Sequence, residues 1–588
     1  MKKRIAVIDR EKCHPNECGN YLCAKLCPVN RAGADCIYPG DDAGKKARID
    51  EFLCTGCGIC PARCPFGAIT IINLPETLNK DPVHRYGENQ FELYSLPSPL
   101  FGKVTGIVGK NGIGKSTVLK IMANLIKPNL GKWGNPPEFK EVLAYFKGSE
   151  IQKFLQQLQK NEIKLSYKPQ QVDLIPKQFK GTVKELLERL GTEKEITSLA
   201  ERLQLSLFLG NDLSTVSGGE LQRVAIAATV LKKSNVYLFD EPSSYLDIKQ
   251  RISLSPFLRS LANESTSVLV IEHDLIILDY MADLINIMYG HEGAFGIVSG
   301  VKSTREGINA FLDGYLKEEN MRFRDHAITF AKGQETGAAL PQKLISWSAL
   351  TKKLGNFNFS AQRGSLRKNE IVGILGENGI GKTSFIKILA GIIKLDSGEV
   401  SSAVKTAYKP QYLESDSELT VLEFLQEAIA RYDHQLIKPL GIESLFSQKL
   451  SQLSGGQLQR VAIAHCLSQD AKLFLLDEPS AYLDVEQRLL ISKIIRNLVR
   501  ERDITVLVVD HDLQFLDYLS DRLIVFTGTP AKTGILQGPF SMEEGINLFL
   551  KNLDITLRRD PASQRPRINN KDSVKDREQR AEKKWYYN

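Results

Sequence analysis

Short, largely apolar runs recur along the chain, and each is followed within a few residues by a segment whose apolar residues are spaced differently. Val104–Val108 and Ile371–Leu375 have the length and composition of strands that are buried on both faces of a sheet. Soon after them, Thr117–Leu125 and Ser384–Ile393 carry apolar residues three and four positions apart, as an amphipathic helix does. A buried strand that leads into a helix predicts a parallel α/β sheet, here in two copies.

The longest apolar runs, such as Ser267–Ile271, are far shorter than the ~18–20 residues that a membrane-spanning helix needs. Met1–Arg4 leads directly into the strand-like Ile5–Ile8, without the pattern of a secretory signal. The chain has 588 residues, of which 42% are apolar and 25% charged, as in an ordinary soluble protein of about three or four domains. We therefore expect a soluble, intracellular protein.

Two segments, Gly109–Ser116 and Gly376–Thr383, have the spacing of a phosphate-binding loop and lie between a predicted strand and a predicted helix. Their glycines let backbone N–H groups converge on phosphates, while the lysine reaches the β- and γ-phosphates and the hydroxyl binds Mg²⁺. The residues assigned to nucleotide and Mg²⁺ are Gly109, Asn111, Gly112, Gly114, Lys115, Ser116, Thr117, Gly376, Asn378, Gly379, Gly381, Lys382, Thr383 and Ser384. Tyr86 or Phe91, and Phe357 in the second copy, are candidates for stacking on adenine.

Further pairs of segments carry residues suited to ATP hydrolysis. The predicted strands Val236–Asp240 and Leu473–Asp477 each run into an Asp-Glu pair, which places both carboxylates at the carboxyl edge of a sheet. The Asp is suited to bind Mg²⁺ through its coordination shell, and the Glu is suited to act as a base or to position the attacking water. The candidate catalytic residues are Glu241, Glu478, His273 and His511, and the other nucleotide candidates are Asp240, Asp477, Gln170, Gln411, Ser217, Gly218, Gly219, Ser454, Gly455 and Gly456.

Each of these motifs has an ordinary structural explanation when it is taken alone, since a Ser-Gly-Gly segment is often a turn and a helix cap. The order of the motifs, which is the same in both copies, argues against such separate explanations. The second copy follows the first by 267 residues at Lys115, 241 at Gln170, 237 at Ser217 and 238 at His273. The chain therefore contains an internal duplication, and the first copy has about 26 additional residues between its lysine and its glutamine.

Two kinds of segment lie outside the shared motifs. The additional residues, around Pro137–Lys164, include a charged amphipathic helix that is either a surface elaboration or a docking element. After the two histidines come the similar segments Arg305–Leu312 and Glu543–Leu550, whose matching glutamates are again 238 residues apart. We expect a pair of packing helices there, and their position favours a hinge that braces the two copies.

Eight of the ten cysteines precede residue 65, in two sets of four. The second set has the spacing Cys-x2-Cys-x2-Cys-x3-Cys-Pro, which binds a [4Fe–4S] cluster with three thiolates and lends the fourth to a neighbouring cluster. The first set is more widely spaced but also ends in Cys-Pro. The predicted metal ligands are Cys13, Cys18, Cys23, Cys27, Cys54, Cys57, Cys60 and Cys64.

The crossing rule of such clusters places Cys27 with the second set and Cys64 with the first. Zinc, which uses two Cys-x2-Cys pairs, and a disulfide framework are the alternatives. Cys36 and Cys466 lie outside both sets, and we expect them to be buried free thiols.

The net charge of +8 is unevenly spread, because the last 31 residues, from Arg558, hold ten Lys or Arg and five Asp or Glu. A segment of this kind is usually solvated and partly disordered. The alternative is an electrostatic contact with an RNA-rich partner.

The order of phosphate loop, Gln, Ser-Gly-Gly, Asp-Glu strand and His resembles that of ABC-type ATPases. In that family two cassettes face head to tail, and each ATP is held between the phosphate loop of one and the Ser-Gly-Gly signature of the other. The resemblance therefore implies two composite sites. One combines Lys115, Ser116, Gln170, Asp240, Glu241 and His273 with Ser454, Gly455 and Gly456, and the other combines Lys382, Thr383, Gln411, Asp477, Glu478 and His511 with Ser217, Gly218 and Gly219.

With its eight-cysteine head, the whole chain resembles the ABC-E subfamily, also called the RNase L inhibitor family. The resemblance implies an ATPase whose closing cassettes move the iron–sulfur head and split post-termination or stalled ribosomes into large and small subunits. It implies ATP, Mg²⁺ and two [4Fe–4S] clusters as cofactors. The implied partners are the ribosome (small subunit, rRNA and ribosomal proteins) and a release factor or its stalled-ribosome relative. The resemblance also implies a cytoplasmic monomer that does not bind a membrane. A redox-linked ATPase in electron transfer and the ATPase of an importer are the alternatives.

The predicted fold class is α/β, with two ABC-type P-loop nucleotide-binding domains in head-to-tail arrangement, an N-terminal ferredoxin-like α+β iron–sulfur domain and hinge helices. The predicted domains are residues 1–75 for the iron–sulfur head, 76–300 for the first cassette with its helical insert at about 137–164, 301–340 for the first hinge, 341–535 for the second cassette, and 536–588 for the second hinge and the basic tail.

Overall fold

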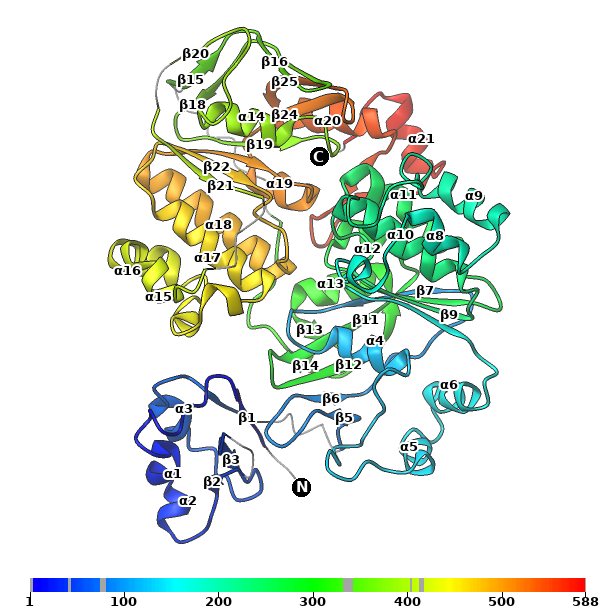
Figure 1. The fold of residues 1–588 in the computed structure, drawn as a ribbon, viewed down its shortest axis with the longest axis vertical. Helices are drawn as coiled ribbons and strands as arrows, with labels where there is room; N and C mark the ends of the chain where they lie inside the picture. The colour runs from blue at the N-terminus through cyan, green and yellow to red at the C-terminus, as the bar shows by residue number, and fades with distance from the viewer. Residues whose placement is uncertain are drawn as a thin grey trace. The chain divides into compact units, whose positions relative to one another are not determined.

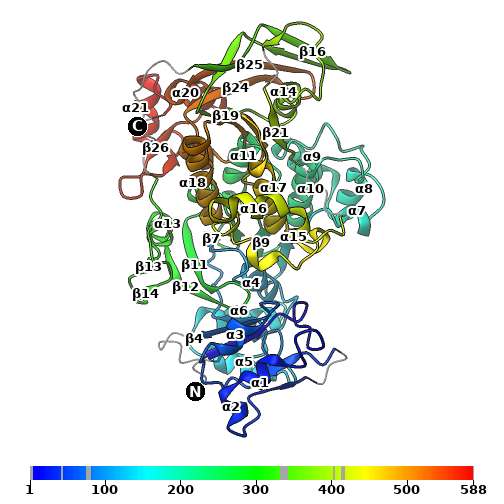
Figure 2. The same cartoon turned by 90° about the vertical axis from the view of Figure 1, so that its left-hand side faces the viewer.

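The computed structural model describes residues 4–40, 44–73, 81–330, 342–401, 404–411 and 417–586. The chain divides into two compact units. Unit 1 comprises residues 1–244, 257–273 and 282–326, and unit 2 comprises residues 245–256, 274–281 and 327–588. Figures 1 and 2 show the ribbon from two directions, coloured from blue at the N-terminus to red at the C-terminus.

The N-terminal head is a small α+β fold whose core consists largely of cysteines. Its elements are β1 (Arg4–Ile8), α1 (Leu22–Leu26), α2 (Pro28–Arg31), β2 (Ile37–Pro39), β3 (Ala47–Ile49), α3 (Ile59–Arg63) and β4 (Ile69–Asn73). Strand β1 pairs antiparallel with β4, and β2 with β3. Ile8, Ile37 and Ile49 pack in one buried cluster with cysteine side chains of both sets. So small a head has little apolar core of its own.

The first cassette is built on an eight-stranded sheet in the order β5-β6-β12-β11-β7-β10-β9-β8. Strands β7 to β11 run parallel, whereas β12 runs antiparallel to β11 and β5 runs antiparallel to β6. The strands are β5 (His84–Arg85), β6 (Glu92–Tyr94), β7 (Val104–Val108), β8 (Leu165–Lys168), β9 (Val236–Asp240), β10 (Ser267–Ile271), β11 (Leu284–His291) and β12 (Phe295–Ser303). Every residue of β7, β9 and β10 is buried, which confirms the buried strands predicted from the apolar runs.

The helices of the first cassette connect these strands. They are α4 (Lys115–Met122), α5 (Phe139–Tyr145), α6 (Glu150–Gln159), α7 (Ile175–Gln178), α8 (Val183–Glu188), α9 (Glu193–Arg202), α10 (Gly218–Leu231), α11 (Ile248–Arg259) and α12 (Leu275–Met281). The parallel strands and their crossover helices confirm the α/β class.

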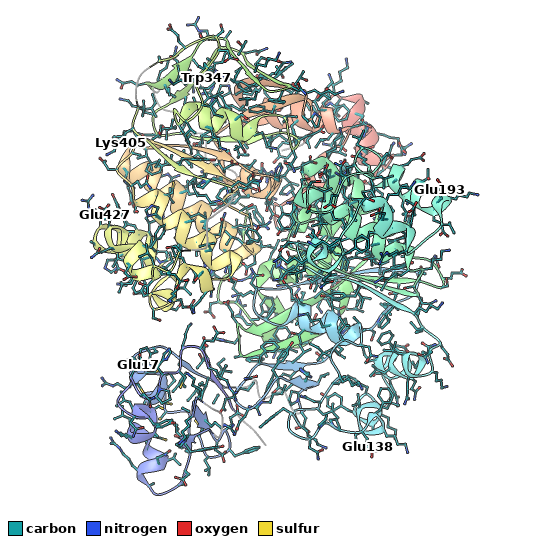
Figure 3. All side chains as sticks on the ribbon, viewed as in Figure 1. Glu17, Glu138, Glu193, Trp347, Lys405 and Glu427 are labelled. Atoms are coloured by element: carbon teal, nitrogen blue, oxygen red, sulfur yellow. The ribbon has the colours of Figure 1, made fainter. Side chains whose placement is uncertain are left out.

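The additional segment of the first cassette forms helices α5 and α6, as the amphipathic pattern predicted. Figure 3 marks Glu138, the residue that precedes α5. Ile151, Phe154 and Leu155 of α6 are buried and belong to the core cluster of the cassette. The insert is thus packed on its own cassette through one face of α6, and its polar face stays exposed.

The second cassette has a sheet in the order β16-β17-β25-β24-β19-β23-β22-β21. Position for position, this order is equivalent to that of the first sheet, so the duplication in the sequence extends to the strand topology. The strands are β16 (Leu350–Leu354), β17 (Phe357–Ala361), β19 (Ile371–Leu375), β21 (Thr406–Lys409), β22 (Leu473–Asp477), β23 (Thr505–Val509), β24 (Arg522–Thr529) and β25 (Thr533–Ser541). A separate sheet joins β18 (Gly364–Arg367), β15 (Lys343–Trp347) and β20 (Val400–Ser401).

The helices of the second cassette match those of the first at the shared motifs. They are α14 (Lys382–Leu389), α15 (Val421–Phe424), α16 (Gln426–Tyr432), α17 (Gly455–Ser468), α18 (Val485–Arg502) and α19 (Leu513–Leu519), with a π-helical turn at Asp433–Ile437 and 3₁₀ turns at Glu443–Leu445 and Leu450–Gln452. The two ribbons in Figure 1 therefore repeat one plan, with α4 and α14 as equivalent helices.

Each cassette is followed by a helix and a hairpin, which confirms the paired helices predicted from the repeated segments. After the first come α13 (Thr304–Asp313), β13 (Tyr315–Leu316) and β14 (Met321–Arg322). After the second come α20 (Met542–Leu553), β26 (Leu557–Arg559), β27 (Pro566–Ile568) and α21 (Val574–Ala581).

The basic C-terminal segment differs from the partly disordered one that its charge indicated. It forms β26, β27 and α21, and Arg565 is fully buried. Within unit 2, Arg565 Nη1 and Arg567 Nε pair with Asp279 Oδ2 at 3.1 and 2.5 Å. Basic residues can be buried here because carboxylates from distant parts of the sequence neutralise them. In the described part of the chain, no helix is long and apolar enough to cross a membrane.

Candidate nucleotide sites and cysteine centre

The first phosphate loop runs from β7 into α4, as its motif predicted. Lys115 is buried, and its ammonium donates hydrogen bonds to the carbonyl oxygens of Gly109 and Lys110, at 3.0 and 2.6 Å. Gly114 has a φ of +89°, and an added Cβ would lie 2.5 Å from Cζ of Phe91. Only glycine fits both the left-handed backbone and this close approach. Phe91 thus lies against the loop.

The second phosphate loop repeats this arrangement between β19 and α14. Lys382 Nζ donates to the carbonyl oxygens of Gly376 and Glu377, at 2.8 and 2.7 Å. Burial lowers the pKa of Lys382 to about 8. Gly381 has a φ of +93°, and an added Cβ would lie 3.0 Å from the ring of Phe357. Phe91 and Phe357 therefore occupy equivalent places. Tyr86, the third aromatic candidate, hydrogen-bonds through its hydroxyl to Thr117 Oγ1 at 3.0 Å.

The hydroxyl of each phosphate loop meets the Asp at the end of a buried strand. Thr383 Oγ1 donates to Asp477 Oδ2 at 2.8 Å, and Ser116 hydrogen-bonds to Asp240. Burial raises the pKa of Asp240, and that of Asp477 to about 6. The Oδ1 atom of each Asp is buried without a hydrogen-bond partner among the described residues. A hydroxyl beside a carboxylate with one oxygen left over fits the ligand set of Mg²⁺.

Three predicted residues of the first cassette meet at one carboxylate. Gln170 Nε2 donates to Glu241 Oε1 at 2.8 Å, and His273 Nε2 lies 3.3 Å from the same oxygen. Burial raises the pKa of Glu241, but the hydrogen bond and charge of His273, the charge of Lys115 and the hydrogen bond from Ser244 together lower it to about 2. The carboxylate is therefore ionised near neutral pH, as a group that accepts a proton from water must be.

The second cassette brings together the corresponding residues. Gln411 Nε2 donates to Glu478 Oε1 at 2.7 Å, and His511 Nε2 lies 3.4 Å from that oxygen. The pKa of Glu478 is raised by burial, but His511, Lys382 and Gln411 together lower it to about 2. Burial and the positive charge of Lys382 lower the pKa of His511, so a neutral imidazole that donates through Nε2 is the form we favour near pH 7. Sequence spacing alone could not show that Gln, Glu and His converge on one atom.

Both Ser-Gly-Gly segments lie where they were expected, at the start of α10 and α17. Ser217 is the N-cap of α10 and forms a capping box with Glu220, and Ser454 does the same in α17 with Gln457. Their ordinary role as helix caps is therefore present as well. A helix N-terminus with unpaired N–H groups is also a site that attracts an anion such as a phosphate.

Sequence reasoning assigned no role to two lysines that contact the Asp-Glu pairs. Lys168 and Lys409 are buried at the ends of β8 and β21, beside the carbonyl groups of those pairs. The available signal was the repeated tetrapeptide Tyr-Lys-Pro-Gln, which ends in Gln170 and Gln411.

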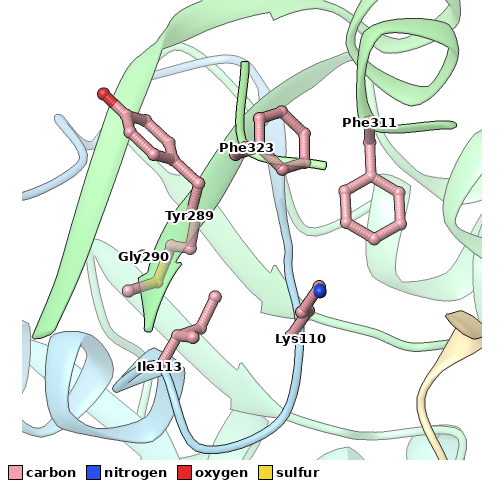
Figure 4. Close-up of a pocket in the computed structure, with 7 residues that line it drawn as sticks. Lys110, Ile113, Tyr289, Gly290, Phe311 and Phe323 are labelled. Carbon is pink, nitrogen blue, oxygen red and sulfur yellow. The ribbon is translucent and has the colours of Figure 1, made fainter. Parts of the chain in front are cut away.

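A small cavity lies behind the first phosphate loop (Figure 4). Lys110 and Ile113 line it from the loop, and Phe311 and Phe323 line it from the segment that follows the cassette. Phe323 stacks on Tyr289 and on Phe311, with ring centroids 5.9 and 6.4 Å apart. The stacked rings therefore place α13 and the β13–β14 hairpin directly next to the phosphate loop.

None of the ten cysteines forms a disulfide in this structure, which argues against the disulfide framework. Cys36 and Cys466 are buried, as predicted. In the described part of the chain, no three His, Cys, Asp or Glu side chains are close enough to hold a single metal ion.

Mutual electrostatic effects show which cysteines are neighbours. Burial raises the pKa of Cys23 to about 11, and negative charge on Cys18, Cys13 and Cys64 adds to the rise. Cys64 of the second set therefore lies among members of the first set. In the same way, burial and the charges of Cys27 and Cys54 raise the pKa of Cys36, which places Cys36 near one member of each set.

Two sheets of equal topology, each with a phosphate loop, a Mg²⁺ ligand pair and a Gln–Glu–His contact, define an ATPase with twin ABC cassettes. Comparison with known families agrees: residues 101–244 and 359–481 match the family described as ABC transporter. Residues 47–70 match a 4Fe-4S binding domain, and residues 4–35 match a possible Fer4-like domain in RNase L inhibitor. The chain thus joins an iron–sulfur head to nucleotide- and Mg²⁺-dependent ATPase cassettes.

Whole-length relatives give the particular family. ABC transporter E family member 1 of Arabidopsis thaliana is 44% identical, over 99% of this chain and 98% of its own length. Translation initiation factor RLI1 of Saccharomyces cerevisiae is 43% identical, over 99% and 98%. A chain in the structure of ribosome-bound archaeal Pelota and ABCE1 is 49% identical, with a TM-score of 0.94 and coverage of 100% of this chain and 99% of that one. The protein belongs to the ABC transporter E family, the family of the RNase L inhibitor.

Proposed function

We propose that this protein is a cytoplasmic ribosome recycling factor that uses ATP to split post-termination or stalled ribosomes into large and small subunits. The observation that carries the proposal is an iron–sulfur head joined to two cassettes in which both sets of hydrolytic residues are complete. One similar structure, 48% identical with a TM-score of 0.81 and covering 86% of this chain and 99% of that one, holds an archaeal ribosome recycling factor with the ribosomal stalk protein aP1. Nothing in these relatives supports the redox alternative.

The proposed partners are the ribosome, through its small subunit, rRNA and ribosomal proteins, and a release factor or its stalled-ribosome relative. The relative in which archaeal ABCE1 and Pelota are bound to a ribosome supports both. The protein would act as a monomer, because one chain already supplies two cassettes.

The proposed cofactors of the head are two [4Fe–4S] clusters, held by crossed sets of ligands. Cys13, Cys18, Cys23 and Cys64 would hold one, and Cys54, Cys57, Cys60 and Cys27 the other. The raised pKa values described above support this division, since Cys64 lies among members of the set that it would complete, and Cys36 lies near both Cys27 and Cys54. When bound, the clusters would act as rigid cross-links for a head that has little apolar core of its own.

Each ATP would lie between the phosphate loop of one cassette and the Ser-Gly-Gly signature of the other. The lysine of the loop neutralises phosphate charge, the Asp and the hydroxyl hold Mg²⁺, and Phe91 and Phe357 are the proposed adenine-stacking rings. Hydrogen bonds to charged groups contribute ~1.5–3 kcal/mol each, so a few N–H donors from a signature helix suffice to hold the cassettes closed. Loss of the γ-phosphate removes those bonds and allows opening.

Within each site, the Gln and the His orient the Glu carboxylate, which accepts a hydrogen bond from the attacking water and takes its proton. Glu241 serves one site and Glu478 the other. Both carboxylates are ionised at neutral pH because the histidine, the lysine of the phosphate loop and neighbouring hydrogen-bond donors lower their pKa, so no proton has to leave before they can act.

The proposal is tested by sedimentation of ribosomes on sucrose gradients after incubation with the anaerobically purified protein. With ATP and a release factor we expect intact ribosomes to be converted into subunits. The Glu241→Gln/Glu478→Gln double variant should remain on the small subunit when ATP is present. Glu427→Gln, on the exposed side of α16, is the matched control and should behave as the wild type. A double variant that sediments free of ribosomes would refute the proposal.

A further inference from the structure

One lysine in each cassette is buried at the end of an edge strand. Lys168 ends β8 and Lys409 ends β21, and their exposed fractions are 0 and 1%. A buried ammonium group is costly unless it is fully hydrogen-bonded, so an apolar side chain would be expected at such a position. Both cassettes nevertheless have a buried lysine at this equivalent position.

The ammonium group of Lys168 binds main-chain atoms of the catalytic strand. Its Nζ donates to the carbonyl oxygen of Asp240 at 2.9 Å and to that of Glu241 at 3.2 Å. Gln222 Nε2 donates to the Glu241 carbonyl as well, at 2.7 Å. Two donors thus fix the peptide that follows the catalytic glutamate.

The second cassette repeats these contacts. Lys409 Nζ donates to the carbonyl oxygens of Asp477 and Glu478, at 2.8 and 3.3 Å. Gln459 Nε2 donates to the Glu478 carbonyl at 2.7 Å. Both copies of the duplication thus keep the same set of contacts at the Asp-Glu pair.

The peptide that these donors hold has an unfavourable conformation. Glu241 has a φ of +46° and Glu478 a φ of +48°. A residue with a Cβ is strained in this left-handed region and persists there only where the surroundings enforce it. Here the lysine and the glutamine enforce this conformation, because they donate hydrogen bonds to the carbonyl groups of the turn.

In each cassette, the segment that runs from the lysine to the glutamine hydrogen-bonds the glutamate at two points. Lys168 binds its main chain, and Gln170, two residues later, binds its carboxylate. Lys409 and Gln411 do the same for Glu478. Any displacement of the segment therefore moves both ends of the catalytic glutamate together.

We infer that Lys168 and Lys409 are positioning residues for ATP hydrolysis: their ammonium groups hold the strained Asp-Glu turn and so aim the glutamate carboxylate at the attacking water. They do not touch the reacting atoms themselves. The inference requires only the ATPase activity of the family and would stand even if the substrate of the machine were not a ribosome.

The test uses the full-length, cluster-loaded protein and compares Lys168→Met/Lys409→Met with the wild type. Met has a similar length and no charge, so it keeps the packing and removes the two hydrogen bonds. Hydrogen bonds to a charged group contribute enough that we expect kcat to fall about 10- to 100-fold. The KM for ATP should change less than about twofold, because the phosphate loops are untouched. Lys164→Met/Lys405→Met is the matched control, since both lysines are exposed residues at the same offset just before β8 and β21 (Figure 3 marks Lys405).

The split between the two kinetic constants separates positioning of the glutamate from a role in ATP binding. An unchanged kcat in the Met variant, or a rise in KM alone, would overturn the inference. If the double variant does not fold, Lys168→Met and Lys409→Met are compared singly with the wild type, and an unchanged kcat in both would overturn it as well.

Discussion

In the second cassette, Arg559 Nη2 donates hydrogen bonds to both carboxylate oxygens of Asp517, at 3.1 and 2.9 Å. Asp517 lies on α19, the helix that begins two residues after His511. The Tyr586 hydroxyl donates to the same carboxylate at 2.7 Å. The C-terminal segment is thereby attached to the helix that follows the histidine of the nucleotide site.

Replacement of Arg559 by Met should detach this segment. The side chains of Arg559 and Asp517 are both 11% exposed, so the substitution leaves a largely buried carboxylate without its cation. We expect a loss of roughly 2–4 kcal/mol in local stability. Hydrogen exchange of residues 557–586 should then become faster, while the core strands of the cassette keep their protection. Arg577→Met, on the exposed side of α21, is the control, and equal exchange in both variants would contradict the prediction.

Removal of His511 should make hydrolysis sensitive to mild acid. The hydrogen bond from His511 is the main influence that lowers the pKa of Glu478, while burial raises it. Without the histidine the pKa of Glu478 rises, and the carboxylate becomes protonated, and inactive as a base, at a higher pH. As the pH is lowered from about 7 to 5, we expect kcat of His511→Ala to fall. In the wild type the Glu478 carboxylate stays ionised over this range and does not limit kcat.

That measurement is best made in a Glu241→Gln background, in which the second site alone carries the hydrolysis. His434→Ala, an exposed histidine of the same cassette, is the control. A His511→Ala profile parallel to that of the control would show that another group sets the acid limit.

Phe323 should stabilise the first hinge segment against the cassette. Its ring stacks on Tyr289 and Phe311, and the guanidinium of Arg324 lies over the Phe311 and Phe323 rings. Phe323→Ala removes a half-buried ring, so we expect a loss of about 2 kcal/mol, seen as a lower temperature for the first unfolding transition. Phe52→Ala should leave that temperature unchanged, because Phe52 is 77% exposed. An equal effect of the two substitutions would refute the role of the stack.

The crossed cluster ligands can be tested through iron content. If Cys13 and Cys64 serve one cluster, Cys13→Ser and Cys64→Ser should each lose about half of the iron and acid-labile sulfide, and the double variant should lose no more. Cys13→Ser combined with Cys54→Ser should lose nearly all of it. Cys466→Ser, in the second cassette, should keep the full content. Additive losses from Cys13→Ser and Cys64→Ser would disprove the crossing.

Two features of the chain illustrate where the information in the sequence ended. The basic C-terminal segment looked solvated because its basic residues outnumber its acidic ones two to one. Its partners, Asp279 and Asp517, lie far away along the chain and reach it only in the fold. Lys168 was part of a repeated tetrapeptide, yet nothing in its spacing revealed that the side chain is buried or that it turns toward a main-chain carbonyl.

The sequence by itself determined the two α/β cassettes, their duplication, the phosphate loops and the cysteine sets, because these depend on local periodicity and on fixed spacings within one segment. Only the tertiary structure decided which side chains converge. Gln170, Glu241 and His273 come from three strand ends that are adjacent in the sheet but up to about a hundred residues apart in the chain. Their distances, and the pKa shifts that follow from burial, depend on strand order and packing, which no spacing within a single segment encodes.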